Sequence, residues 1–345
     1  MRYGGTMLLT QPYQLKNLTL VNRLVMPPMC MYQAKDGFAN NFHFTHYTNA
    51  AFGKVGLIIQ EASGVTSGGR ITDHCLGIWD DKFIPALKEI VDEVHRNGSK
   101  MGVQLIHAGR KSEVTDHRHV APSAIRHSDR YPIPEELTID EIHEIVRAFG
   151  KATIRAQIIG YDVLEIHGAH GYLIHQFMSP LSNHRMDDYG GSTENRGRFL
   201  REIVAEIKKF WPSEKVLQVR VSASDYDPEG LNENEVGMLL EQIKDEIDLI
   251  HVSSGGNVNR QIPLKPGYQV EFASYLKHRL GLPVIAVGLI TGIDQAENIL
   301  TEDKADLVAL GRELLRNPYW MFEAMAKDNK SDQLLPSYAR AFRER

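Results

Sequence analysis

The chain has 345 residues, of which 42% are hydrophobic and 24% are charged. This balance predicts a folded chain with a sizeable core and excludes long disordered tracts. The formal net charge of −5 lacks the basic surplus of a nucleic-acid-binding protein. Two cysteines exclude a disulfide framework, and no apolar run reaches the length of a signal-peptide core or a transmembrane helix. We therefore expect a cytoplasmic protein with no nucleic-acid or membrane partner.

Short apolar runs alternate with amphipathic segments along the chain. The runs predicted as strands cover residues 24–27, 57–62, 101–106, 163–167, 216–221, 249–252, 284–287 and 307–310. Between them, segments 84–97, 139–159 and 197–211 carry apolar residues every three or four positions, as helices with one buried face do. Thr138 and Glu141 give the second of these helices a capping box. Eight strands that alternate with helices predict an α/β fold, a closed TIM (β/α)8 barrel in one domain over residues 1–345.

A doubly wound open sheet is the structural alternative to the barrel. It normally carries a Gly-x-Gly-x-x-Gly turn after its first strand, but residues 26–30 read Met-Pro-Pro-Met-Cys here. Two additions to the barrel are also predicted. Residues 15–23 resemble a hairpin that plugs the bottom of the barrel, and the polar, proline-bearing segment 111–137 predicts a cap over the opposite face.

Side chains suited to chemistry gather where the predicted strands end. His167, His170 and Tyr172 follow the fourth strand in one turn, in which Gly168 and Gly171 permit a positive φ. In a barrel the carboxyl ends of all strands share the face on which barrel enzymes work. The other strand ends bring Cys30 and Tyr32, Ala62, Gln104 and His107, Arg220, residues 253–256, Gly288, and Gly311 with Arg312 to that face.

Each of these features also has a structural interpretation. An isolated His-x-x-His pair is more often structural, or half of a zinc site, but Tyr172 and the strand-end position favour catalysis. No cysteine or carboxylate lies at metal spacing near the pair, so we predict no metal site. For Cys30, packing and function are equally open, whereas Cys75 is interpreted as structural.

The glycine turns after the last two strands suit a bound phosphate. Backbone amides and a helix N-terminus commonly hold a phosphate there, and Arg312 adds a bidentate cation. Taken alone, Gly288 and Gly311 are better explained as plain turn residues. For Arg220, half of a strand-end salt bridge is an equally good explanation.

Long motifs identify a family that the chain resembles. The chain is similar over nearly its whole length to the old yellow enzymes, flavin-dependent ene-reductases, and in particular to the bacterial subgroup with a cysteine after the first strand. The similarity rests on residues 26–32 (MPPMCMY), 104–110 (QLIHAGR), 167–172 (HGAHGY), 177–185 (FMSPLSNHR), 188–192 (DYGGS) and 194–196 (ENR).

The resemblance implies an activity and a set of catalytic residues. In such enzymes NAD(P)H reduces FMN, and the reduced flavin passes hydride from N5 to the β-carbon of an alkene activated by a carbonyl or nitro group. His167 and His170 would hydrogen-bond to the oxygen of that small-molecule substrate and stabilise the developing negative charge. Tyr172 would protonate the α-carbon as general acid, and Tyr32 would add a donor to the substrate oxygen.

The resemblance also implies the contacts of the flavin. Gln104 would pair with the polar edge of the ring, Arg220 would stabilise the anionic reduced flavin, and Cys30 would adjust its reduction potential. The remaining implied contacts are Pro27, Met29 and Ala62 at the ring, and Gly288, Gly311 and Arg312 at the phosphate.

The C-terminal tail, residues 330–345, predicts an oligomer. In the subgroup a segment like residues 337–342 reaches the active site of a neighbouring subunit, so Arg340 is the candidate inserted arginine and a homodimer or homotetramer is expected. Two rival functions are a metal-dependent barrel hydrolase and a flavin-binding scaffold or redox sensor that does not turn over.

Overall fold

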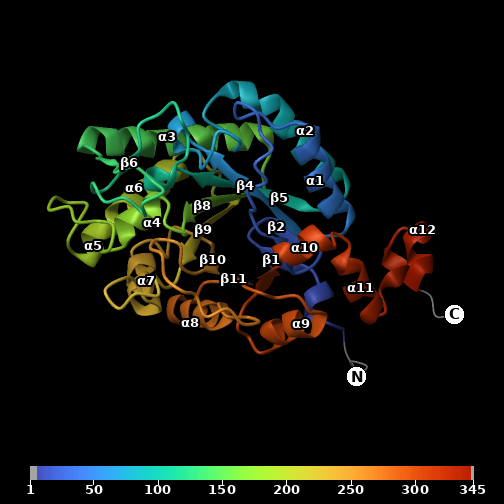
Figure 1. The fold of residues 1–345 in the computed structure, drawn as a ribbon. Coiled ribbons are helices and arrows are strands. Elements are labelled where there is room, and N and C mark those ends of the chain that lie inside the picture. Colours follow the sequence, from blue (N-terminus) through green and yellow to red (C-terminus); the bar gives the residue numbers. More distant parts are fainter. Residues whose placement is uncertain (1–5, 343–345) are drawn as a thin grey trace.

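The computed structural model describes residues 6–342, and eight parallel strands form a closed barrel at its centre (Figure 1). The strands are β3 (Leu24–Met26), β4 (Leu57–Gly64), β5 (Lys100–Ile106), β8 (Val163–Gly168), β9 (Val216–Ser222), β10 (Leu249–Ser253), β11 (Val284–Val287) and β12 (Leu307–Ala309). They follow one another around the barrel in chain order, and β12 closes it by pairing with β3. The predicted TIM barrel is therefore confirmed, and every predicted strand end agrees within two residues.

Helices follow the strands and cover the outside of the barrel (Figure 1). They are α1 (Asn41–Phe52), α2 (Ile84–Arg96), α3 (Ile139–Ile159), α4 (Leu173–Met178), α5 (Thr193–Arg196), α6 (Arg198–Lys208), α7 (Glu233–Glu241), α8 (Val270–Leu280), α9 (Ile293–Thr301), α10 (Arg312–Arg316), α11 (Trp320–Lys327) and α12 (Pro336–Ala339). Helix α3 has the predicted bounds and the predicted capping box of Thr138 and Glu141. Within residues 6–342 no helix is both long and apolar enough to cross a membrane.

Three predicted boundaries are wrong for identifiable reasons. The helix predicted over residues 197–211 begins at Arg198, because Gly197 ends the separate turn α5, and it ends at Lys208, ahead of Pro212. Strand β4 continues past Ala62 through a register shift against β5. Strand β3 ends at Met26, since Pro27 has no N–H for a ladder hydrogen bond.

A hairpin closes the lower end of the barrel, as predicted, although it lies nearer the N-terminus than residues 15–23. Strands β1 (Tyr13–Leu15) and β2 (Leu18–Leu20) pair antiparallel across a turn at Lys16. Leu18 and Leu20 of β2 belong to a buried cluster that also contains residues from seven barrel strands. This cluster, called the apolar layer below, consists of Leu18, Leu20, Val25, Leu57, Ile59, Val163, Val216, Leu249, Ile285, Leu307 and Ala309.

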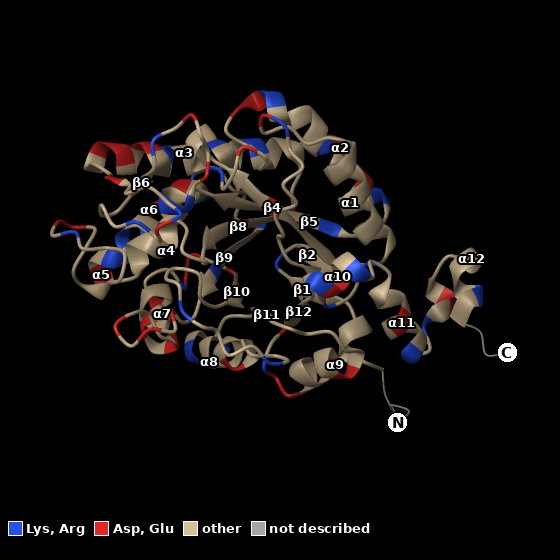
Figure 2. Ribbon diagram, in the orientation of Figure 1, with Lys and Arg blue, Asp and Glu red and all other residues tan. Residues whose placement is uncertain are grey.

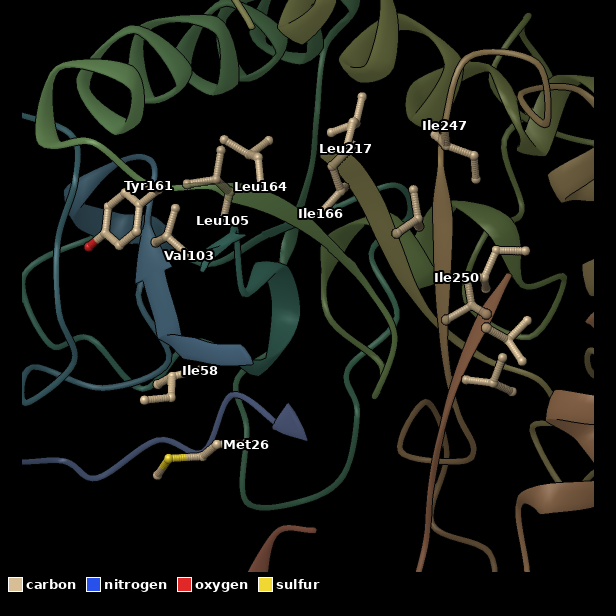
Figure 3. Close-up of a cluster of buried hydrophobic side chains, with 14 of the residues drawn as sticks. Met26, Ile58, Val103, Leu105, Tyr161, Leu164, Ile166, Leu217, Ile247 and Ile250 are labelled. Carbon is tan, nitrogen blue, oxygen red and sulfur yellow. The ribbon is translucent and has the colours of Figure 1, made fainter. Parts of the chain in front are cut away.

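Outward-facing side chains of the strands pack against the helices. Leu164 and Ile166 of β8, Leu217 of β9 and Ile250 of β10 belong to the large buried cluster shown in Figure 3. Helix residues such as Phe149 of α3 complete that cluster. Strands buried on both faces explain why the sequence shows continuous apolar runs rather than strict alternation.

The segment after β5 lies over the upper face, as the predicted cap requires. It contains the short paired strands β6 (Val120–Ala121) and β7 (Glu135–Glu136). The Arg110 guanidinium at its start donates to the backbone oxygen of Asn257 at 2.7 Å, and a ring nitrogen of His127 lies 3.2 Å from the oxygen of Gly256. These contacts join the segment to the loop after β10.

Candidate functional site

The inward-facing side chains change from apolar to polar toward the carboxyl end of each strand. Along β8 every second residue faces the interior, with Val163 in the apolar layer, Glu165 above it and His167 at the mouth. On β9, Gln218 is in register with Glu165, and Arg220 with His167. The strand period of two thus places polar side chains at two successive levels above the apolar layer, facing one upper chamber.

Glu165 is the centre of this polar level. Its buried carboxylate accepts hydrogen bonds from Gln104 Nε2 at 2.8 Å and Gln218 Nε2 at 2.6 Å, and His251 Nδ1 lies 2.8 Å away. Burial alone would raise the pKa of Glu165, but His251 and the positive charge of Arg220 hold it below its usual value. We call these five residues, Gln104, Glu165, Gln218, Arg220 and His251, the polar layer.

The two histidines and the tyrosine after β8 meet at the mouth of the barrel. The ring of His167 lies 5.3 Å from that of His170 and 4.9 Å from that of Tyr172, centre to centre. His170 has a φ of 58°, and its backbone N–H donates to Ser222 Oγ at 2.9 Å, which fixes the turn. The structure therefore brings together the three residues that the sequence singled out.

Both histidines are neutral near pH 7. Burial lowers the pKa of each well below its usual value, and the charge of Arg220 lowers it further. Nδ1 of His167 accepts the N–H of Ala169 at 3.2 Å, so the proton of this neutral ring resides on Nε2. Nε2 of His170 lies 2.7 Å from Ser253 Oγ.

Tyr172 is a protonated phenol held against a cation. Burial raises its pKa well above the usual value, and the neighbouring Cys30 raises it further. The ammonium group of Lys111 lies 4.9 Å from the centre of the Tyr172 ring and donates to the backbone oxygen of His170 at 2.8 Å. Lys111 therefore fixes the position of the ring relative to the turn that carries both histidines.

A cavity opens at the ends of β11 and β12. Arg220, Gly288, Gly311, Arg312 and Arg316 line it. Figure 2 shows the basic ends of α10 beside the barrel mouth. Arg316 was not predicted from the sequence, because its contribution depends on the short helix that brings it back to the cavity.

The wall of this cavity requires glycine at position 288. Gly288 has a φ of 130°, and a Cβ there would lie 2.9 Å from Gln269 Nε2. Buried Gln269 was also missed; its Nε2 donates to Val287 O at 2.9 Å, and its Oε1 accepts from Ser254 Oγ at 2.6 Å. At Gly311 a Cβ would have ordinary contact distances, so its role is not steric.

The loop after β3 forms another side of the chamber. Pro27 is buried, whereas Met29 and Cys30 are partly buried, and Tyr32 is 47% exposed with a φ of 55°. A buried carboxylate fixes the loop, since the N–H of Met31 donates to Glu61 Oε2 at 3.0 Å.

Of the remaining predicted residues, Ala62 and Cys75 lie beside Cys30, whereas Arg340 lies in the C-terminal tail. Ala62 is buried in a small cluster that also contains Cys75, and Cys30 and Tyr172 pack against it. Arg340 is exposed in the terminal 3₁₀ turn that follows α12, and its Nε donates to Ser337 O. Helix α12 itself lies at the outer edge of the molecule (Figure 1). Among residues 6–342, no group of three or more metal-ligating side chains is suited to hold an ion.

Comparisons with known proteins agree on one family. The chain matches the model of the NADH:flavin oxidoreductase / NADH oxidase family over residues 8–331. It is 50% identical over 334 residues to an NADPH dehydrogenase of Clostridium acetobutylicum, covering 96% of this chain and 98% of that protein. An NADPH dehydrogenase of Geobacillus thermodenitrificans is 48% identical over 338 residues, with 97% and 98% covered. The structure of morphinone reductase superposes with a TM-score of 0.80 at 27% identity, covering 92% of this chain and 88% of that one.

Proposed function

Since the chain belongs to the NADH:flavin oxidoreductase / NADH oxidase family, that of the old yellow enzymes, and is thus an FMN-dependent NAD(P)H oxidoreductase, we propose that it reduces activated alkenes. Its substrates are α,β-unsaturated carbonyl compounds or their nitro counterparts. The observation that carries this proposal is the meeting of two neutral histidines with a protonated tyrosine above a buried arginine.

The side chains at the barrel mouth fit FMN. Nε of buried Arg220 has no hydrogen-bond partner within the described residues, and an oxygen or anionic nitrogen of the flavin ring would satisfy it. Nε2 of Gln104 is committed to Glu165, so its Oε1 is the atom left to accept an N–H of the ring. When bound, FMN takes hydride from NAD(P)H and delivers it to the substrate.

The phosphate of FMN would lie in the cavity at β11 and β12. Gly288 leaves the backbone open, and the amides after Gly311 begin helix α10. Arg312 and Arg316 supply two positive charges beside them. Pro27, Met29, Cys30 and Ala62 would contact the ring from the sides of β3 and β4.

His167 and His170 would bind the substrate oxygen. In a neutral His167 the proton on Nε2 is available to donate. When Ser253 donates its hydroxyl proton to Nε2 of His170, the proton of that ring is left on Nδ1, also available. Two neutral donors hold an oxygen and stabilise the negative charge that develops on it during hydride transfer. Tyr32 would add a third donor from the loop after β3.

Tyr172 would deliver the proton to the α-carbon. Its raised pKa keeps the phenol protonated at neutral pH, and its ring is fixed against His167 and Lys111. The two donors, His167 and His170, and the acid, Tyr172, lie in one turn. They would therefore contact the carbonyl oxygen and the α-carbon of the same small substrate at the same time.

Oligomerisation is part of the proposal. Arg340 is exposed in the turn that follows α12, a helix at the outer edge of its own chain (Figure 1), so a neighbouring subunit would have to supply the site it enters. A homodimer or homotetramer is therefore proposed, and a cytoplasmic location stays a prediction.

Turnover of 2-cyclohexen-1-one with NADPH tests the proposed function. We expect one saturated ketone for each NADPH consumed, in the absence of oxygen. Consumption of NADPH only in the presence of oxygen, with the enone recovered unchanged, would exclude alkene reduction and leave an oxidase or a flavin scaffold.

A further inference from the structure

The two cysteines of the chain lie side by side, although 45 positions separate Cys30 from Cys75. Cys30 packs against the buried cluster that contains Cys75, and each of the two thiols shifts the pKa of the other. Two backbone hydrogen bonds hold the segments together: Ala34 N donates to His74 O at 3.0 Å, and Gly77 N donates to Gly37 O at 2.9 Å. Both cysteines are free thiols in this structure.

The two sulfurs have different surroundings, which shift the pKa values of their thiols in opposite directions. Sγ of Cys75 lies 3.4 Å from the N–H of Thr72 and 3.5 Å from its hydroxyl. The hydrogen bond from Cys30 and then those from Thr72 lower the pKa of Cys75, whereas the same bond with Cys75, together with burial, raises the pKa of Cys30. Cys75 thus has the thiolate character and Cys30 keeps the proton.

Access to the pair is from the active-site chamber. Cys75 is almost fully buried, but Cys30 is partly exposed and shares its cluster contact with Tyr172. An oxidant that approaches from the chamber therefore meets Cys30 before Cys75.

We propose that Cys30 and Cys75 are a redox-active pair that a peroxide converts reversibly into an intramolecular disulfide. The thiolate sulfur attacks one peroxide oxygen, the O–O bond breaks, and the released hydroxide takes a proton to become water. The second thiol then attacks the sulfenic sulfur, the S–O bond breaks, and a second water leaves. Two electrons pass from the sulfurs to the peroxide. This inference goes beyond alkene reduction and does not depend on it.

Thiol counting by mass spectrometry tests the pair directly. The FMN-containing protein is treated with hydrogen peroxide, denatured in iodoacetamide and analysed intact and as peptides. Untreated protein should be alkylated at both of its two cysteines. After peroxide we expect no alkylation, a mass lower by two hydrogen atoms, a peptide that joins Cys30 to Cys75, and full recovery of both thiols with dithiothreitol.

Variants separate the pair from ordinary thiol oxidation. In Cys30→Ser the thiolate sulfur of Cys75 has no thiol partner, so we expect a sulfenic acid at Cys75 that dimedone traps. Thr72→Val keeps both sulfurs but removes one contact to Cys75, so its disulfide should still form, several-fold more slowly. Wild-type protein that gains oxygen at one cysteine while the other stays alkylatable would overturn the proposal. So would a disulfide between two chains, or two free thiols after peroxide treatment that oxidises a free cysteine peptide.

Discussion

The same strands fill the lower half of the barrel interior with apolar side chains and the upper half with polar ones. Below, the apolar layer needs no specific partners, and each of its large side chains contributes about 1.5–3 kcal/mol through burial. Above, the polar layer is buried equally well, but every donor and acceptor there requires a partner. Val163 and Glu165, two residues apart on β8, belong to the two halves.

The difference appears in what each half leaves unsatisfied. Within the described residues, Arg220 Nε, Gln218 Oε1 and His251 Nε2 of the polar layer are buried without a hydrogen-bond partner. A core designed for stability alone would not contain such atoms, since each costs about 1–3 kcal/mol. The lower half therefore supports the fold, and the upper half has polar atoms to offer to a ligand. A change in the upper half should therefore affect chemistry, and a change in the lower half should affect stability.

Tyr172→Phe should have the largest effect on the upper half alone. Loss of the phenolic proton should slow alkene reduction about 10²–10⁴-fold, while reduction of the flavin by NADPH and the free energy of unfolding change little. Stopped-flow measurement of the two half-reactions checks this. Tyr275→Phe, which removes a hydroxyl on the outer face of α8, is the matched control. Equal turnover in both variants would assign the proton to another donor.

Leu57→Ala should have the converse effect. Removing three buried carbon atoms from the apolar layer should lower the free energy of unfolding by about 2–5 kcal/mol. Urea denaturation measures that loss. The visible spectrum and the rates of both half-reactions should stay as in the wild type at temperatures where the variant is folded; a changed spectrum would mean that the two halves are not independent.

Glu61→Gln should change how stability depends on pH, because the Glu61 carboxyl group on β4 holds the loop after β3. Burial raises the pKa of Glu61 from 4.5 to about 7, so between these values the folded chain binds the proton more tightly than the unfolded chain. Wild-type stability should therefore fall as pH rises through this window, by on the order of 3 kcal/mol. Glu61→Gln should lack that fall. Urea denaturation at pH 5 and pH 8 checks this, and parallel slopes for the two proteins would contradict it.

Glu165→Gln should give the smallest effect, on the electrostatics of the polar layer. Removing the carboxylate leaves the charge of Arg220 uncompensated, which favours the anionic reduced flavin. The reduction potential should rise by about 20 mV, equivalent to about 1 kcal/mol for two electrons. Glu89→Gln removes the same charge from an exposed position on α2 and should leave the potential unchanged. A fall in the reduction potential would contradict the proposal that Glu165 compensates the charge of Arg220 beside the flavin.

The sequence was sufficient to predict what depends on one strand or one turn. The eight strands, the helix at residues 139–159 and the cluster of His167, His170 and Tyr172 are local patterns, and the structure agrees with them. The barrel topology then brings the predicted strand ends to one face, because parallel strands all end there.

The sequence was not sufficient to predict contacts between distant segments. Glu165 and His251 lie in apolar runs, and nothing in a period of two tells which side of a strand faces inward. Cys75 looked structural because its neighbour Cys30 is 45 positions away, joined to it only through the loop packing after β3 and β4. Arg316 reaches the cavity from the end of α10, and Gln269 from the residue before α8, so both depend on exact helix boundaries.

The most direct test of the account is an anaerobic titration followed by visible absorption. The purified protein should show oxidised-flavin bands, lose them when NADPH is added, and regain them when 2-cyclohexen-1-one is added. Recovery of the bands with the enone would establish that the upper half of the barrel binds a flavin and passes its electrons to an alkene. A colourless protein that takes up no added FMN would contradict the flavin site, and bands that stay bleached with the enone would contradict the donor and acid roles of His167, His170 and Tyr172.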